Sequence, residues 1–134
     1  MSPRFLLDTH IVFWWLTDQE MLSAVQKAAI RHSEVGGMPI HISSISLWEI
    51  AMMVERRRVS LTTSIDVFFD NIERSRFIKL LQITPQVAIE STRLGDEAPK
   101  DPADQLIIAT ARTFALRLVT SDDRIRKSGI VVTV

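Results

Sequence analysis

The chain has 134 residues, and its 16 basic and 16 acidic side chains give a formal net charge of zero. This length fits one domain, which we expect to span residues 1–134, and any polyanionic partner must then be attracted by local patches. The absence of cysteine excludes disulfides and thiolate zinc sites. Asp8 comes too early for a signal-peptide core, and no apolar run reaches the roughly 20 residues of a membrane span. We therefore expect a cytoplasmic protein with no membrane contact.

The first third of the chain predicts a strand and two helices. The segment 4–7, which is apolar after Arg4, predicts a buried strand. A helix starts at Asp8-Thr9 with Ile11, Trp14 and Trp15 at helical spacing. That spacing leaves Phe13 off the apolar face, so we expect Phe13 to be exposed and available to a partner. A second helix is predicted over 22–34.

The apolar face of this second helix is expected to hold Leu22, Val25 and Ala29, and Gly36-Gly37 ends the helix. A second strand follows over 40–42. The serines after it offer N-caps for a further helix, which carries an apolar face from 47 to 54 and runs into the basic segment 55–58. An amphipathic helix over 64–76 and a strand over 78–83 come next.

The last third continues the alternation of helices and strands. A helix opens at Pro85 and runs to about residue 94, a loop covers 95–100, and the next helix begins at Asp101-Pro102, with proline at the first helical position. The remaining predicted elements are a strand over 118–120, a helix over 122–127 and a strand over 130–134. Strands that alternate with helices predict an α/β protein, with a parallel sheet covered by helices on both faces.

Four carboxylates stand at equivalent places in this pattern. Each follows an apolar run directly or lies in the first turn of the next helix, and they are Asp8, Glu49, Asp104 and Asp122. In an open α/β sheet these junctions share one edge, outside the carboxyl ends of the strands. Four acids gathered there repel one another unless a cation holds them, and Mg²⁺ or Mn²⁺ prefers carboxylate oxygen. The pattern indicates metal-assisted chemistry.

Each acid also has a purely structural explanation. Asp8, Asp101 and Asp122 are placed as helix N-caps, and Ser46-x-x-Glu49 matches a capping box. Asp104 fits this explanation less well, because Asp101 already supplies the cap of its helix. Four independent caps also have no reason to share one sheet edge, so the set favours a metal site.

Four segments, in this order and spacing, resemble the motifs of a known family. They are LLDTH at 6–10, SLWEI at 46–50, DPADQLIIATA at 101–111 and TSD at 120–122. The chain resembles PIN domains over nearly its full length, and most of all the VapC-type toxins of bacterial toxin–antitoxin systems. The resemblance implies a three-layer α/β/α sandwich with a mainly parallel sheet, and a ribonuclease that depends on Mg²⁺ or Mn²⁺.

The resemblance also assigns roles to residues. It maps the acidic quartet of the family onto Asp8, Glu49, Asp104 and Asp122, with Thr120 as the hydroxyl residue that supports the last acid. We expect Asp8 and Asp104 to bind metal directly, and Glu49 and Asp122 to act on a second ion or through water. Thr9 and Asp101 are expected to be auxiliary.

The toxin resemblance implies partners as well. We expect an RNA substrate, a homodimer, and a co-expressed antitoxin that covers the acids with a cationic side chain such as arginine. Met52 and Met53 are candidates for an apolar contact surface.

Three other functions are compatible with part of this pattern. A haloacid-dehalogenase-like phosphatase needs a second aspartate two residues after the first, where this chain has His10. A phosphoacceptor receiver domain needs a lysine after a late strand, and none follows 118–119 closely. A non-catalytic PIN-fold RNA-binding or scaffold protein stays open, although such proteins typically lose part of the acidic quartet.

Overall fold

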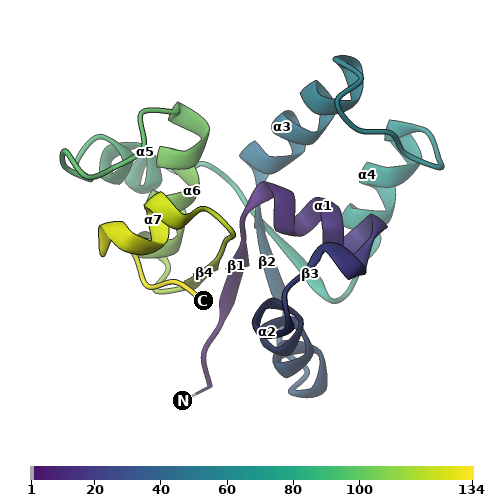
Figure 1. Ribbon diagram of the computed structural model, residues 1–134, viewed down its shortest axis with the longest axis horizontal. Helices are drawn as coiled ribbons and strands as arrows, with labels where there is room; N and C mark the ends of the chain where they lie inside the picture. The colour runs from purple at the N-terminus through teal and green to yellow at the C-terminus, as the bar shows by residue number, and fades with distance from the viewer. Residues whose placement is uncertain (1) are drawn as a thin grey trace.

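The computed structural model describes residues 2–134, whose strands form one sheet of four. β1 (Phe5–Leu7) lies between β2 (Ile40–Ser43) and β4 (Arg117–Val119), and β3 (Ile78–Leu81) pairs with the other side of β2. Every pair is parallel, so the carboxyl ends of all strands meet at one edge, at the top of Figure 1. The predicted parallel sheet is confirmed.

Seven helices and one 3₁₀ turn accompany the strands in the described chain. They are α1 (Thr9–Thr17), the turn η1 (Gln19–Met21), α2 (Ala24–Val35), α3 (Ser44–Glu55), α4 (Ile65–Arg74), α5 (Pro85–Ser91), α6 (Pro102–Thr113) and α7 (Asp123–Ser128). Among residues 2–134, none of these helices is long and apolar enough to cross a membrane.

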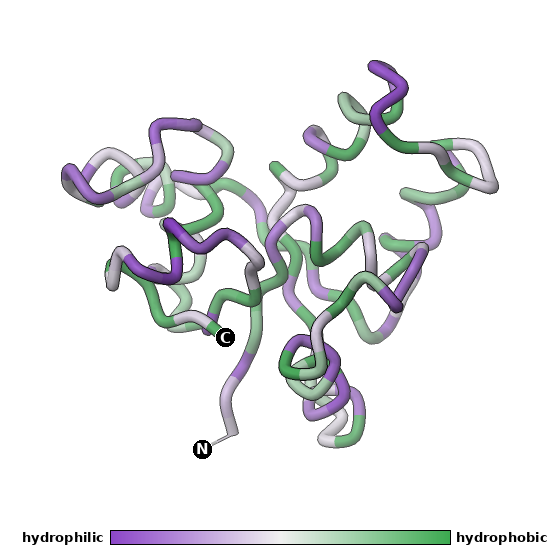
Figure 2. Tube along the Cα trace, viewed as in Figure 1, coloured by the Kyte–Doolittle hydropathy of each residue, from purple (hydrophilic) through white to green (hydrophobic). Residues whose placement is uncertain are grey.

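The sheet separates two hydrophobic cores. Phe5 and Leu7 of β1 pack with residues of α1, α2, α3 and α4, whereas Leu6 between them packs with residues of α6 and α7. This alternation follows from the period of two in a strand. The two groups of helices lie on opposite sides of the sheet in Figure 1, and Figure 2 shows hydrophilic residues concentrated on the outer turns and loops. The chain is therefore a three-layer α/β/α sandwich.

The prediction that Phe13 is exposed is wrong. Phe13 is 8% exposed, and its ring lies 6.4 Å from that of Phe68 in α4. A single apolar stripe does not describe α1, because this helix packs against both the sheet and α4, and Phe13 belongs to the second of these contacts.

Two further predictions on the helices are corrected. Val25 is 61% exposed, because the cap at Ser23 starts α2 at Ala24 and its buried face is formed by residues 26, 29, 30 and 33. Ser46 forms no capping box with Glu49, since the N-cap of α3 is Ser43, whose hydroxyl accepts the Ile45 N–H at 3.2 Å.

The predicted strand over 130–134 is reduced to one isolated bridge between Thr133 and Leu118 of β4. Ile130 and Val131 pack instead against the core beneath α6 and α7. The carbonyl of Ile130 accepts a hydrogen bond from the Arg112 side chain at 3.3 Å. In a strand, this carbonyl would instead pair with the backbone of a neighbouring strand.

Candidate metal centre

Asp8 is held in a fixed orientation at the end of β1. It is the N-cap of α1, and its Oδ1 accepts the Thr9 N–H at 2.8 Å. Its Oδ2 accepts the hydroxyl of Thr120 at 2.7 Å. Burial raises the pKa of Asp8, and these two hydrogen bonds oppose the rise because they favour the ionised form.

Thr120 joins Asp8 to Asp122. Its fully buried hydroxyl accepts the Asp122 N–H at 3.1 Å while it donates to Asp8. Asp122 caps α7, and its Oδ1 accepts the N–H groups of Arg124 and Ile125 at 2.9 and 3.3 Å. The first and last acids of the predicted quartet thus share one hydroxyl.

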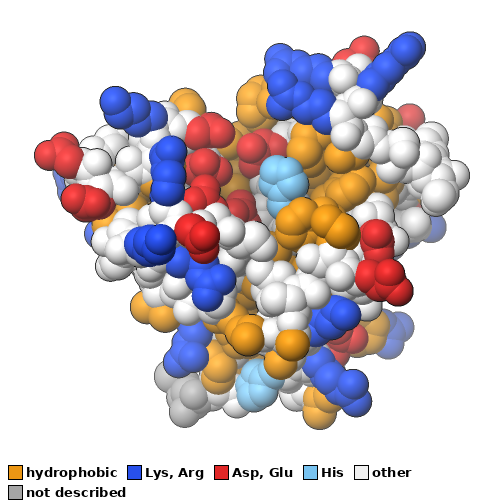
Figure 3. Space-filling view, in the orientation of Figure 1, with side chains coloured by type: hydrophobic (Ala, Val, Ile, Leu, Met, Phe, Trp, Pro, Cys, Tyr) orange, Lys and Arg blue, Asp and Glu red, His pale blue; other side chains and the backbone are white. Residues whose placement is uncertain are grey.

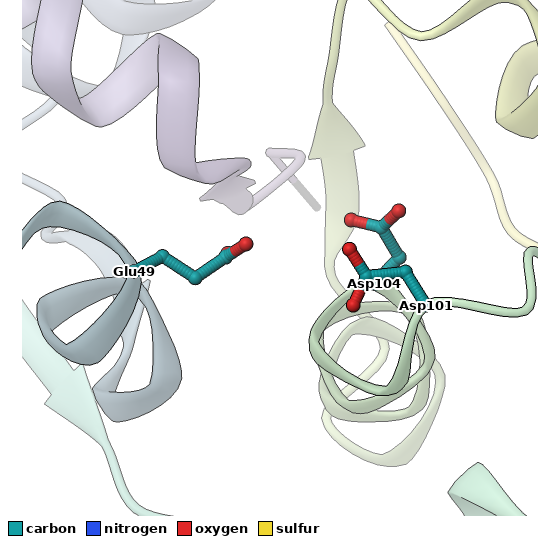
Figure 4. Close-up of side chains that lie close together, drawn as sticks. All are labelled: Glu49, Asp101 and Asp104. Carbon is teal, nitrogen blue, oxygen red and sulfur yellow. The ribbon is translucent and has the colours of Figure 1, made fainter. Parts of the chain in front are cut away.

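A second group of acids forms the tightest cluster. Glu49 of α3 points across toward Asp101 and Asp104 at the start of α6, as Figure 4 shows. Each of the three offers a carboxylate oxygen, and these three oxygens lie within 4.8 Å of one another. Asp101 also caps α6 by accepting the Ala103 N–H at 2.9 Å.

The electrostatics link the two groups. The pKa of Asp104 is raised to about 7, first by burial and then by the negative charges of Asp8, Asp101, Glu49 and Asp122. The pKa of Glu49 is raised by burial and then by the charges of Asp8 and Asp101. We call these five carboxylates the acidic site. The charges of the other four disfavour the ionised form of Asp104, and a cation bound among them would relieve this repulsion.

The members of the predicted quartet lie in two groups within the acidic site. Asp104 and Glu49 belong to the tight cluster with Asp101, which was expected to be auxiliary. Asp8 lies close enough to raise the pKa of Asp104, but both of its oxygens already accept hydrogen bonds. In Figure 3 acidic side chains fill the hollow between the two halves of the molecule.

Thr9, which was expected to be auxiliary, forms hydrogen bonds with acids of both groups. Its N–H bonds Asp8, and its hydroxyl donates to Oε1 of Glu49, so it ties the two groups of acids together. The hydroxyl of Ser46 lies 2.8 Å from that of Thr9. The sequence suggested only a helix-capping role for Ser46. Its position one turn before Glu49 on the same helix is the feature that could have predicted its place beside the site.

Comparisons with known proteins agree with this architecture. The family model of the PIN domain matches residues 5–130. Ribonuclease VapC22 of Mycobacterium tuberculosis is 34% identical over 121 residues, which is 90% of this chain and 88% of that protein.

Solved structures share the fold at low sequence identity. VapBC2 of Rickettsia felis, bound to a promoter DNA fragment, has a TM-score of 0.71 at 16% identity and covers 97% of this chain and 96% of its own. DNA-bound VapBC of Salmonella typhimurium has a TM-score of 0.70 at 20% identity, covering 99% and 98%. VapC20 of M. tuberculosis, described as a sarcin–ricin loop cleaving toxin, has a TM-score of 0.63 at 17% identity, covering 95% and 96%. The chain belongs to the PIN domain family, and over most of its length it is similar to a VapC ribonuclease of that family.

Proposed function

We propose that the protein is an endoribonuclease that hydrolyses RNA phosphodiester bonds with Mg²⁺ or Mn²⁺ at the acidic site. The observation that carries this proposal is the cluster of Glu49, Asp101 and Asp104, with carboxylate oxygens within 4.8 Å of one another. The donor set fits the ion, because hard divalent cations take carboxylate oxygens and keep some of their waters.

The residues divide the work between them. Asp104, Glu49 and Asp101 are the nearest donors to a common point, while Asp8 and Asp122 supply further negative charge from fixed positions. A divalent cation held by these carboxylates would supply two things: neutralisation of the charge on the scissile phosphate, and a lowered pKa for a water molecule that could serve as the nucleophile. The chain keeps the reacting groups in place through the hydrogen bonds of Thr9 and Thr120 to the acids.

RNA must approach this negative site through positive groups around it. Lys100 directly precedes Asp101, and Arg124 lies two residues after Asp122; both side chains belong to exposed residues. We propose that they contact the RNA backbone on either side of the bond that is cut, since contacts to phosphate position a nucleic acid without reading its sequence.

We also propose that the protein is the toxin of a toxin–antitoxin pair. Its support is the 34% identity to a protein named ribonuclease VapC22 and the shared fold with VapBC complexes. An antitoxin of complementary chemistry would place an arginine among the carboxylates, where a bidentate contact substitutes for the charge of the metal. We expect a cytoplasmic homodimer when the protein is expressed alone.

Cleavage of a structured RNA by the purified protein tests this function. Cleavage should require Mg²⁺ or Mn²⁺, stop in EDTA, and be lost in Asp104→Asn with an unchanged circular dichroism spectrum. Asp123→Asn is the matched control, because Asp123 is an exposed acid in the first turn of α7 outside the tight cluster. Full activity in excess EDTA would exclude the metal mechanism, and metal binding without cleavage would favour the scaffold alternative.

Expression in a bacterium that lacks any antitoxin tests the toxin assignment. The wild type and Asp123→Asn should arrest growth, whereas Asp104→Asn should not. Harmless expression of a folded, RNA-cleaving wild type would contradict the toxin assignment and leave the ribonuclease proposal standing.

A further inference from the structure

Ser46 lies behind the acidic site without touching its carboxylates. It is in the first turn of α3, one turn before Glu49, and its side chain is fully buried. Its Oγ lies 2.8 Å from Oγ1 of Thr9, which is itself only 3% exposed. The Ser46 hydroxyl contacts a residue 37 positions away in the sequence, at the start of α1.

The direction of this hydrogen bond follows from the number of protons available. The Thr9 hydroxyl carries one proton and donates it to Oε1 of Glu49. Thr9 must then accept in its contact with Ser46, so Ser46 is the donor. The result is a chain directed from Ser46 to Thr9 to Glu49, in which each bond polarises the next.

We propose that Ser46 is a positioning residue for the acidic site, acting on Glu49 through the hydroxyl of Thr9. This inference rests on the proposed metal-binding function. Glu49 reaches the cluster on a long side chain from α3, whereas Asp101 and Asp104 lie at the start of α6. Thr9 fixes where the Glu49 carboxylate ends, and Ser46 fixes the rotation of the Thr9 hydroxyl.

The same geometry couples Glu49 to Asp8. The backbone N–H of Thr9 bonds Oδ1 of Asp8 at 2.8 Å while its hydroxyl bonds Glu49. Thr9 therefore orients carboxylates from both groups of the acidic site, and a loosened Thr9 side chain disturbs the distance between them. Partners that orient metal ligands in this way typically change metal affinity by about 10- to 100-fold when removed.

The affinity of the purified, metal-free protein for Mn²⁺, measured by calorimetry, tests the proposal without relying on activity. Ser46→Ala should weaken Mn²⁺ binding by about 10-fold, and Thr9→Val by at least as much. Thr9→Ser, which keeps the hydroxyl, should bind close to wild type. In the double variant Ser46→Ala/Thr9→Val, the serine substitution should add nothing, because its route to Glu49 is already gone.

Two alanine variants provide matched controls. Ser33→Ala removes a fully buried hydroxyl that has no hydrogen-bond partner in the described chain, and it should leave Mn²⁺ affinity unchanged. Ser43→Ala removes the cap of α3 and should lower the melting temperature while keeping the affinity. Ser46→Cys has nearly the shape of serine with a weak donor, so it gives a second test if the alanine variant does not fold.

Wild-type affinity in Ser46→Ala, or independent losses that add in the double variant, would overturn the inference. A similar loss of affinity in Ser43→Ala would also overturn it, because the effect would then come from weakening α3. A wild type that does not bind Mn²⁺ would overturn the proposed function, and this inference with it.

Discussion

Thr120 contacts two acids of the site with one hydroxyl. The sequence identified Thr120 as support for Asp122 alone. In the structure its hydroxyl oxygen accepts the Asp122 N–H, and the same hydroxyl donates a hydrogen bond to Oδ2 of Asp8. The Thr120 side chain is fully buried. A single hydroxyl just after β4 thereby fixes the carboxylate after β1 and the start of α7.

Replacement of Thr120 measures this double contact. Thr120→Val keeps the shape of the side chain but removes the hydrogen-bond partner of Oδ2 of Asp8 and of the Asp122 N–H. It should lower the free energy of unfolding by about 1–3 kcal/mol. Thr120→Ser should recover most of the loss. Chemical denaturation of the metal-free proteins gives the comparison, and equal stability of the valine and serine variants would show that the hydroxyl contributes nothing.

At the scale of elements, the start of α6 combines a structural and a chemical task. Asp101 caps the helix, Pro102 occupies its first position, and Asp104 follows in the first turn. Acids in this first turn interact favourably with the helix dipole. The same turn brings Asp101 and Asp104 beside Glu49. The start of α6 therefore stabilises their negative charges and also places them close to a third negative charge.

Two substitutions at Asp101 separate these tasks. Asn caps a helix about as well as Asp, so Asp101→Asn should melt no lower than the wild type without metal, because it also removes a repelling charge. Asp101→Ala should be about 1 kcal/mol less stable than Asp101→Asn. Both should weaken Mn²⁺ binding. Wild-type affinity in Asp101→Asn would show that Asp101 is a cap and not part of the metal site.

At the scale of the whole molecule, a neutral chain concentrates acids in one place and leaves them unpaired. The usual pKa of an aspartate is 3.8, and that of Asp104 is about 7. Between these values the folded protein binds a proton that the unfolded chain has released. Asp104 therefore contributes stability to the metal-free protein at low pH, and this contribution is lost as the pH rises from about 4 to 7.

The pH dependence of the melting temperature tests this sign. His41 acts in the opposite direction, because burial lowers its pKa and stability then increases as pH rises toward 6.5. Because His41 is present in both the wild type and Asp104→Asn, its contribution cancels when the two proteins are compared. The wild type should lose more stability than the variant between pH 5 and pH 8, and millimolar Mg²⁺ should reduce the difference by binding the folded state. Parallel curves for the two proteins would contradict the raised pKa.

The sequence predicted the features that depend on local pattern. Short apolar runs and helix starts predicted the order of strands and helices along the chain, and the positions of Asp8 and Asp122 after strands placed both at the carboxyl edge. What the pattern missed depends on contacts between distant segments. Phe13 is buried because α4 covers it, and the donor role of Ser46 requires Thr9 of another helix.

The grouping of the acids within the site also could not be predicted from local sequence pattern. Asp101 and Asp104 are three residues apart on α6, but only the packing of α3 against α6 brings Glu49 to them and makes Asp101 part of the tight cluster. Asp8 was expected to be a direct ligand, and its two hydrogen-bonded oxygens give it a more fixed setting than the sequence indicates.

A crystal grown with Mn²⁺ tests the central claim most directly, because the anomalous scattering of manganese locates the ion without assumptions about its ligands. We expect a peak within coordination distance of carboxylate oxygens from Glu49 and Asp104, and no peak there in crystals of Asp104→Asn. An acidic site without a peak at Mn²⁺ concentrations that support RNA cleavage, or a peak bound by other residues, would contradict the account.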